Sequence, residues 1–504
     1  MLNYTEEVPV QPIDAYIKSM KDRFHSLFNV EYNFNNLSLQ RGLPKPFLDE
    51  IMALKPLSVA IPSEFGGRGV KVAECLRVLS AASYESLSLS LIFGINIALF
   101  LEPLAKYGNP LIQEKVFQDF LQNKAMGGLM ITEPAYGSDA LNMRTSYAEH
   151  ANGYHMKGQK HWQGLTGDAN YWLVAARKKN PSGDLMRDVD FMMTENGIPS
   201  QKIHVSRKYN NLGLYAIPYG INDIDVQVPL THRLTPESTG IKMMLDILHR
   251  SRLQFPGMAA GFIKRLMDET LAHCANRQVS GAKLHEMDSV KFQLSRLQAS
   301  FTLASAMCAY STTISSIHTD LATHGVDANS VKALVTDLMQ ESAQIALQLA
   351  GANGYRLDHI AGRGVVDSRP FQIFEGSNEM LYAQIAEGVL KSMKKAKETN
   401  FLQFLKQYNL TKNAAGEFAA SLNFSLSDSI KQRDLVVLGR IIARVVCFQF
   451  VMDVNNKGFD NEMTSITRQH MNMDISMLVG QLNSATNCSP VMAYEENSDW
   501  TRFI

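Results

Sequence analysis

The sequence predicts an α+β protein of several domains: an N-terminal all-α domain, a central β-barrel or β-sandwich domain, a C-terminal four-helix bundle and an extra helical region. Apolar residues recur at helical spacings up to about Lys124, short strand-like segments run from Gly127 to Pro236, and long helical patterns return from Gly240. Helices and strands are therefore segregated along the chain, which disfavours the alternating βαβ order of a dinucleotide-binding fold. The predicted domains are 1–126, 127–236, 237–392 and 393–504.

The first domain holds the most apolar stretch of the chain, LSLSLIFGINIALFL, Leu87 to Leu101. A membrane-spanning helix needs about 20 predominantly apolar residues. This stretch is shorter and contains serines and an asparagine, so we expect a buried core helix. The nearby glycine cluster FGGRG lacks the strand and helix context of a phosphate-binding loop, so a turn is expected there.

The central domain and the bundle each have one clear representative segment. In INDIDVQVPL, Ile224, Val226 and Val228 alternate with polar residues, the period of a half-buried strand. VKALVTDLMQESAQIALQLAG carries an apolar stripe at helical spacing, and Gly351 is placed to cap its carboxyl end.

The region from 393 onwards begins with KSMKKAKETN, which indicates a linker or an exposed helix end. DLVVLGRIIARVVCFQFVMDV then predicts a long helix. Two roles for this region are left undecided. It could be an extra domain that replaces part of an oligomer interface, or an amphipathic element that contacts a membrane. The second would carry a denser basic face than Arg433, Arg440 and Arg444 provide, so internal packing is favoured.

Composition excludes several classes of function. Lys+Arg and Asp+Glu both number 49, so nothing in the net charge indicates a nucleic acid partner. The five cysteines, which are Cys75, Cys274, Cys308, Cys447 and Cys488, form no CxxC pair, and the histidines form no HExxH motif. We therefore expect neither a disulfide framework nor a metal site. The N-terminus lacks the apolar core of a signal peptide, so the expected location is cytoplasmic, without stable membrane insertion.

Glu375, in RPFQIFEGSNEML, lies between an apolar run and a glycine. Burial disfavours the ionised form of a carboxyl group, so its pKa should be raised. A carboxylate of this kind can act as a general base near neutral pH. The alternative interpretation is a plain helix start, with Ser377 and Glu379 as polar residues of the first turn.

A series of further motifs decides between these interpretations. LMITEPAYGSDALNMRTS resembles the flavin-binding signature of the acyl-CoA dehydrogenase family, GQKHW its GxKxW segment and INDIDVQVP its strand ending in VP. HRSRLQFPGMAAG, RQVSGAKLHEMDSVKFQLSRL, LQLAGANGYRLDH and FEGSNE are similar to four later signatures, in the same order. The resemblance covers roughly residues 40 to 392.

The resemblance implies FAD-dependent oxidation of an acyl thioester between its α and β carbons, as in fatty acid metabolism. Glu375 occupies the position of the family's base, which removes the α-proton while flavin N5 accepts the β-hydride. In some relatives the base precedes an arginine at a helix start, but here that position is Ser251, which cannot serve.

Motif matching also implies a set of binding residues. Cofactor contacts are assigned to Met130, Ile131, Thr132, Ser138, Trp162, Gly164, Arg277, Gln348, Gly351, Ser377 and Glu379. Substrate contacts are assigned to Ser138, Arg252 and Gly376. Among these, Arg277 matches an arginine that meets the FAD pyrophosphate, usually across a subunit interface, and arginine suits phosphate because it binds in a bidentate way.

Several positions depart from the family pattern. They are Gln163 and Gly164 after Trp162, Ser280, Asp288, Ala352, Val366 and His249. Each departure removes about one contact, worth ~1 kcal/mol for a neutral hydrogen bond. They indicate a divergent member with altered cofactor geometry or an unusual acyl carrier.

Three functions stay open at this point. The favoured one is an acyl-CoA or acyl-carrier-protein dehydrogenase that passes electrons to a separate acceptor, such as an electron-transfer flavoprotein, and forms a homodimer or homotetramer. A flavin oxidase or monooxygenase is the second, because Gly164 and Ser280 would open the flavin site to solvent. A non-catalytic acyl-CoA-binding member is the third, and the retention of Glu375 argues against it, since a buried charge is costly.

Overall fold

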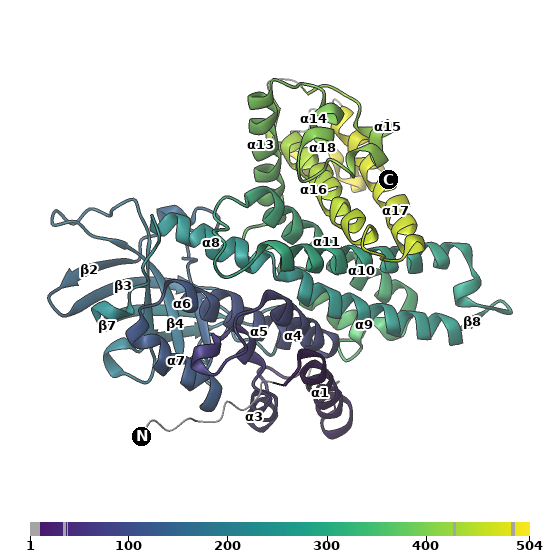
Figure 1. The fold of residues 1–504 in the computed structure, drawn as a ribbon. Coiled ribbons are helices and arrows are strands. Elements are labelled where there is room, and N and C mark those ends of the chain that lie inside the picture. The colour runs from purple at the N-terminus through teal and green to yellow at the C-terminus, as the bar shows by residue number, and fades with distance from the viewer. Residues whose placement is uncertain (1–10, 34–36, 38, 427–429, 485–488) are drawn as a thin grey trace.

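The computed structural model describes residues 11–504 apart from 34–36, 38, 427–429 and 485–488. In Figure 1 the long helices of the bundle cross the middle of the molecule, with the strands at one end and the C-terminal helices stacked above. Cys488 lies outside the described residues, and the other four cysteines are free thiols.

The N-terminal part is helical, as predicted. It consists of α1 (Ile13–His25), η1 (Ser26–Glu31), α3 (Lys45–Ala53), α4 (Val72–Glu85), α5 (Leu87–Asn96), η4 (Ile97–Leu101), α6 (Glu102–Tyr107) and α7 (Pro110–Gln122). Every residue of α5 is buried, and its first turn is capped by Ser86 Oγ, which accepts a hydrogen bond from Leu89 N at 3.3 Å. The expected buried core helix is confirmed.

The middle part is one seven-stranded sheet in the order β1-β4-β2-β3-β7-β6, with β5 also paired to β4. Its strands are β1 (Gly127–Met130), β2 (Ser146–His150), β3 (Gly153–His161), β4 (Tyr171–Lys178), β5 (Asp190–Glu195), β6 (His204–Lys208) and β7 (Gly220–Val228). Along β7, Ile224, Val226 and Val228 are buried while Asp225 and Gln227 are exposed, which confirms the predicted alternation.

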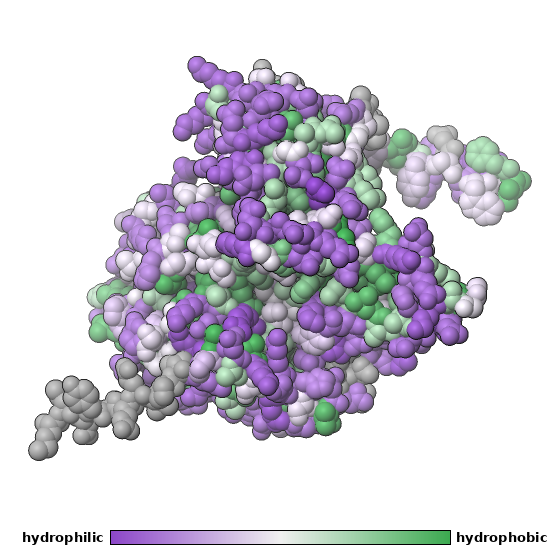
Figure 2. All heavy atoms as spheres, turned by 45° about the vertical axis from the view of Figure 1, so that its right-hand side comes forward, coloured by the Kyte–Doolittle hydropathy of each residue, from purple (hydrophilic) through white to green (hydrophobic). Residues whose placement is uncertain are grey.

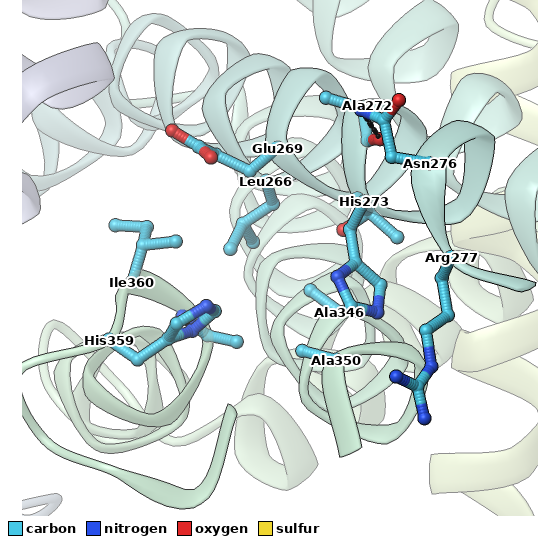
Figure 3. A pocket seen from close by; sticks show the side chains of 12 residues that line it. Leu266, Glu269, Ala272, His273, Asn276, Arg277, Ala346, Ala350, His359 and Ile360 are labelled. Carbon is cyan, nitrogen blue, oxygen red and sulfur yellow. Dashed lines mark hydrogen bonds between the residues drawn. The ribbon is translucent and has the colours of Figure 1, made fainter. Parts of the chain in front are cut away.

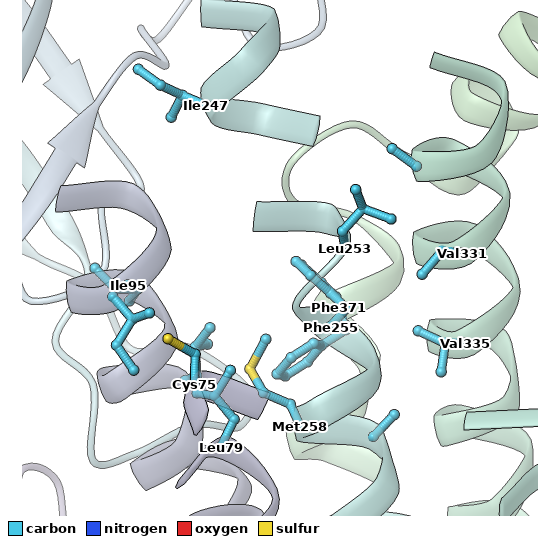
Figure 4. Packing of buried hydrophobic residues seen from close by; sticks show 14 of the residues in the cluster. Cys75, Leu79, Ile95, Ile247, Leu253, Phe255, Met258, Val331, Val335 and Phe371 are labelled. Carbon is cyan, nitrogen blue, oxygen red and sulfur yellow. The ribbon is translucent and has the colours of Figure 1, made fainter. Parts of the chain in front are cut away.

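The bundle follows the sheet. Its helices are α8 (Gly240–Arg252), α9 (Phe255–Asn276), α10 (Asp288–Ile314), α11 (Gly325–Ala350), α12 (Ile360–Ser368) and α13 (Asn378–Ala396), and a short hairpin of β8 (Gln278–Val279) and β9 (Ala282–Lys283) follows α9. α11 ends at Gly351, whose φ of 63° lies in the region that favours glycine, and the expected cap is confirmed. Figure 4 shows how Cys75 and Leu79 of the N-terminal part pack toward Phe255 and Met258 at the start of α9.

The C-terminal extension is helical and packs on the bundle. It contains α14 (Phe401–Gln407), η11 (Ala415–Phe418), α15 (Ala419–Leu422), α16 (Gln432–Asn455), α17 (Asn461–Asn483), α18 (Tyr494–Ser498) and η12 (Trp500–Phe503). α16 contacts α10, α11 and α13, and its central residues from Val437 to Val451 are largely buried, as internal packing requires. KSMKKAKETN proves to be mainly the end of α13, which Lys397 closes with a φ of 54°.

Two helical stretches among the described residues are long and apolar enough to cross a membrane, Leu87–Tyr107 and Gln432–Asn455. Of their most apolar windows, 94% and 72% are buried inside the protein. The face shown in Figure 2 is mostly hydrophilic, with hydrophobic residues in small areas between polar ones.

Candidate active site

The carboxyl group of Glu375 lies on the loop between η10 (Arg369–Gln372) and α13. Its Oε1 accepts a hydrogen bond from Ser251 Oγ at 2.9 Å. Its Oε2 is buried, and no donor among the described residues reaches it. Burial raises the pKa of Glu375 above its ordinary value, although Arg252, Ser251 and Lys332 act in the opposite direction. The raised pKa expected from the sequence is confirmed.

The backbone of this loop is held in an uncommon conformation by two cations. Glu375 has a φ of 54° and Gly376 a φ of 94°, both in the left-handed region. Arg252 donates from Nε and Nη2 to the carbonyl of Glu375, at 3.1 and 2.7 Å. Lys332 Nζ donates to the next carbonyl, that of Gly376, at 2.8 Å. The strain at Glu375 persists because both neighbouring carbonyls are fixed.

Lys332 was not singled out in the sequence, yet it is central to the site. It is fully buried in α11, and its Nζ also donates to Asn378 Oδ1 at 2.9 Å. Burial lowers its pKa to about 7, partly offset by the negative charge of Glu375. A lysine inside the apolar stretch VKALV was the available signal, because a lysine is almost never fully buried without a partner.

Arg252, predicted to bind substrate, is buried at the end of α8, and its guanidinium donates hydrogen bonds to other residues of the protein. Besides the carbonyl of Glu375, it contacts Asn329 Oδ1 through Nη1 at 2.7 Å. Burial lowers its pKa to about 10, and the negative charge of Glu375 opposes this shift. Arg252 therefore stays cationic at neutral pH and holds the loop of the base.

A second surface is formed where β1 and β3 end. The carbonyl of Thr132 accepts from His161 N at 3.0 Å and from Gln163 Nε2 at 3.2 Å. Trp162 adopts a φ of 63°, is 52% exposed, and lies 4.4 Å from Tyr209 between ring centroids. An exposed indole beside backbone polar groups suits the packing of a flat aromatic ring.

The loop beyond Thr132 is fixed by a buried ion pair that the sequence did not predict. Lys160 Nζ lies 3.0 Å from Glu133 Oε1, and the side chains are 0% and 5% exposed. Glu133 also accepts the amides of Arg144 at 2.6 Å and Thr145 at 2.8 Å. Burial lowers the pKa of Lys160 to about 8. The pair thus joins the two motifs TEP and GQKHW.

The other predicted cofactor contacts near this surface, Met130, Ile131 and Ser138, differ in how far they are buried. Met130 is fully buried, so it offers no surface to a cofactor, which argues against the predicted contact. Ile131 is partly buried and its carbonyl accepts from Lys160 Nζ at 2.8 Å. Ser138 is exposed in the loop after β1.

Gly164 does not open the site in the way expected. A Cβ at this position would lie 2.6 Å from Ile95 Cδ1 and 3.2 Å from Ile217 Cγ2. The space beside Gly164 is therefore filled by the protein's own side chains. Ser280, the other residue expected to open the site, lies at the tip of the β8–β9 hairpin, near Arg277.

Arg277, Gln348 and Gly351 are exposed and form a separate region at the far ends of α9 and α11. Arg277 lines a cleft of about 470 Å³ between the ends of α9 and α11 and the start of α12. Figure 3 shows His273 and His359 facing this hollow, with Arg277 at its edge. Gln348 follows Lys332 by sixteen positions on α11, so the two residues lie about 24 Å apart along the helix.

The loop of the base also carries the remaining predicted contacts. Gly376 is closely packed, because a Cβ there would lie 2.9 Å from Met380 Cε. Ser377 occupies the N-cap position of α13 without a capping hydrogen bond from its side chain, and Glu379 is exposed in the first turn. Among the described residues, no group of three or more metal-ligating side chains is placed to hold a metal ion.

Comparison with known proteins agrees with this arrangement. Three domain models match in order: acyl-CoA dehydrogenase N-terminal domain at 20–124, middle domain at 128–224 and C-terminal domain at 238–390. A mitochondrial isovaleryl-CoA dehydrogenase of Pongo abelii is 24% identical over 341 residues, which cover 67% of this chain and 78% of that protein. A mitochondrial very long-chain specific acyl-CoA dehydrogenase of Mus musculus is 24% identical over 367 residues, 70% of this chain and 54% of the relative.

Solved structures share the fold at low identity. Butyryl-CoA dehydrogenase from Megasphaera elsdenii has a TM-score of 0.66 at 20% identity and covers 74% of this chain and 98% of its own. The prolyl acyl carrier protein oxidase AnaB has a TM-score of 0.68 at 16% identity, and the alignment covers 76% of this chain and 99% of the AnaB chain. An acyl-CoA dehydrogenase complexed with FAD from Bacillus anthracis has a TM-score of 0.74 at 17% identity. The alignment covers 96% of this chain and 90% of the Bacillus anthracis chain, so it extends into the C-terminal helices.

The three domain models together match well over half of the chain, in the order that the helical, β and helical parts follow one another. The chain belongs to the acyl-CoA dehydrogenase family, whose members are FAD-dependent oxidoreductases.

Proposed function

We propose that this protein dehydrogenates an acyl thioester between its α and β carbons, with Glu375 as the base that removes the α-proton. The observation that carries the proposal is the carboxyl group itself. One oxygen is oriented by Ser251, the other is buried without a donor, and the pKa is raised by burial. These are the properties of a base that is available to take a proton.

The backbone of the loop supports a second role. In the described part of the chain no acceptor receives the amide N–H of Glu375, while Arg252 and Lys332 hold the carbonyls of Glu375 and Gly376. A free, fixed N–H is suited to stabilise the negative charge that develops on a thioester oxygen when the α-proton leaves. Base and donor then belong to one residue.

The flavin would lie against the second surface, beside Thr132 and Trp162. The exposed indole, its tilted contact with Tyr209, and the fixed carbonyl of Thr132 fit a flat ring system. When bound, FAD would supply the acceptor, its N5, for the hydride that leaves the β carbon. The polypeptide has to hold the thioester between this surface and Glu375.

We propose that the far region serves a second copy of the chain. Arg277, Gln348 and Gly351 are exposed, and Gln348 lies about 24 Å along α11 from Lys332, which holds the base loop. We assign them to the pyrophosphate and adenosine half of a cofactor held mainly by another subunit. This assignment requires a homodimer or a homotetramer.

The acyl carrier and the electron acceptor are proposed at the level of chemical class. Coenzyme A and a carrier protein present the same thioester, and an electron-transfer flavoprotein is the proposed acceptor. An oxidase reaction with O₂ is the second candidate, and the exposure of Trp162 to solvent supports it. The filled space beside Gly164 removes one of the two reasons for it.

An anaerobic titration tests the proposal. Purified FAD-loaded protein is mixed with butyryl-, octanoyl- and palmitoyl-CoA, and the flavin absorbance near 450 nm is followed. Bleaching by at least one thioester is expected, and the chain that bleaches fastest defines the substrate class. Complete absence of bleaching by these compounds and by an acyl-carrier-protein thioester would contradict dehydrogenation.

A further inference from the structure

The C-terminal extension approaches the helix of the base loop at one point of close backbone contact. α16 packs against α13, and the two helices lie side by side in the upper part of Figure 1. At the contact, a Cβ on Gly439 would lie 1.9 Å from the carbonyl oxygen of Tyr382. Glycine is required here because any side chain would force the two helices apart.

From Tyr382 a continuous series of hydrogen bonds runs to the loop of the base. Tyr382 OH donates to Asp337 Oδ2 at 2.7 Å, and Asn378 Nδ2 donates to Asp337 Oδ1 at 2.7 Å. Lys332 Nζ donates to Asn378 Oδ1 at 2.9 Å and to the carbonyl of Gly376 at 2.8 Å. Tyr382, Asn378 and Lys332 are all buried, so each bond would be costly to lose.

Arg440, the residue after Gly439, strengthens this contact. Its guanidinium lies 5.5 Å from the centroid of the Tyr382 ring, within cation–π range. Its Nη2 lies 3.8 Å from Glu379 Oε1 in the first turn of α13. The extension therefore touches the base helix at both Tyr382 and Glu379.

The extension is itself anchored to the bundle by buried charges. Asp474 of α17 is buried and accepts from Arg296 of α10 at 2.9 Å and from Arg444 of α16 at 3.1 Å. Arg296 also binds Glu341 of α11 at 2.8 Å. With this anchor in place, the position of α16 on α13 is fixed relative to α11, which carries Lys332 and Asp337.

We infer that the C-terminal extension is a positioning element of the active site, which holds the Glu375 loop through Tyr382, Asp337, Asn378 and Lys332. The inference rests on the proposed function, because it assigns the loop the role of carrying the base. Tyr382 acts as a positioning residue and touches no reacting atom. The extension then serves the reaction without supplying a group to it.

The test compares four variants of the full-length, FAD-loaded protein. Tyr382→Phe removes only the hydroxyl that reaches Asp337. Its matched control is Tyr310→Phe, since Tyr310 OH donates to the buried Asp327 at 2.6 Å on the same bundle but outside this series. Gly439→Ala forces α16 away from α13, and Gly480→Ala on α17 is its control, because a Cβ there meets nothing within 4 Å.

Two readouts separate positioning from general stability. Hydrogen–deuterium exchange of the peptide spanning 371–382 reports the loop, and the rate of anaerobic flavin reduction at saturating acyl-CoA reports the chemistry. For Tyr382→Phe and Gly439→Ala we expect faster exchange and about tenfold slower reduction. Both controls should stay within twofold of the wild type, with the same FAD content.

Unchanged exchange and unchanged reduction in Tyr382→Phe would overturn the inference, and this variant decides if Gly439→Ala does not fold. Failure of the proposed function gives a different result. In that case the wild type itself would not bleach with any thioester, whereas the exchange comparison would still show whether the extension holds the loop.

Discussion

Glu102 is a buried carboxylate, whereas Glu375, in another part of the molecule, is a partly buried residue whose Oε2 is buried; burial raises the pKa of both. Glu102 begins the short helix α6, and both of its oxygens accept from Gln254 Nε2, at 2.9 and 2.8 Å. Glu375 lies on a strained loop, with one oxygen bound to Ser251 and the other without a donor. Burial alone therefore does not identify a base. The difference lies in the unpaired oxygen and in a backbone held by Arg252 and Lys332.

The largest expected effect on stability concerns Glu102. Burial raises its pKa from 4.5 to about 7, so the folded state binds the extra proton between these values and stability falls as pH rises through that window. Glu102→Gln is uncharged throughout. Relative to the wild type, its unfolding free energy should rise by about 2.5 kcal/mol between pH 5 and pH 8.

Urea unfolding of both proteins at the two pH values measures this difference. A constant difference between pH 5 and pH 8 would show that Glu102 does not titrate in the folded protein. Flavin reduction by Glu102→Gln should stay near the wild-type rate, because Glu102 has no role in proton transfer in this account.

The pH dependence of flavin reduction sharpens the contrast. Only the ionised form of Glu375 can accept a proton, so the rate should rise with pH through a midpoint above the ordinary carboxyl value of about 4.3. Stopped-flow reduction between pH 5 and pH 9 measures the midpoint. A flat profile, with an α-deuterated thioester confirming that proton removal limits the rate, would contradict the assignment.

A smaller effect is expected from Ser251→Ala. Ser251 donates to the ionised carboxyl of Glu375 and so lowers its pKa. Its removal should move the midpoint of the pH profile upward, because one hydrogen bond to the ionised carboxyl is lost. Ser300→Ala, which removes a buried hydroxyl bonded to the carbonyl of Arg296 at 2.9 Å, is the control and should leave the midpoint unchanged.

Local patterns in the sequence were enough to predict the elements and to single out Glu375 as the candidate base. Strand β7 alternates because one of its faces is buried, α5 is apolar on every side because it is enclosed, and Glu375 stands in a motif with a characteristic order of residues. The two alternatives for the extension were separated by the sparse positive charge of α16, and its packing on the bundle agrees.

The residues that hold the Glu375 loop in place could not be predicted from local patterns. Lys332 and Gly376 are 44 residues apart, and Ser251 and Glu375 are 124 apart, so no local period connects them. The space beside Gly164 is filled by Ile95 from another domain, which removes one of the two reasons for expecting an open flavin site. Contacts of this kind follow from how the domains pack.

The most direct test of the central claim is anaerobic flavin reduction by Glu375→Gln, with Glu102→Gln as its matched control, using the acyl-CoA that bleaches the wild type fastest. Glu375→Gln should retain FAD and lose reduction by at least about 10²–10⁴-fold, the range of general base catalysis. Glu102→Gln should reduce normally. Undiminished reduction by Glu375→Gln would contradict the account.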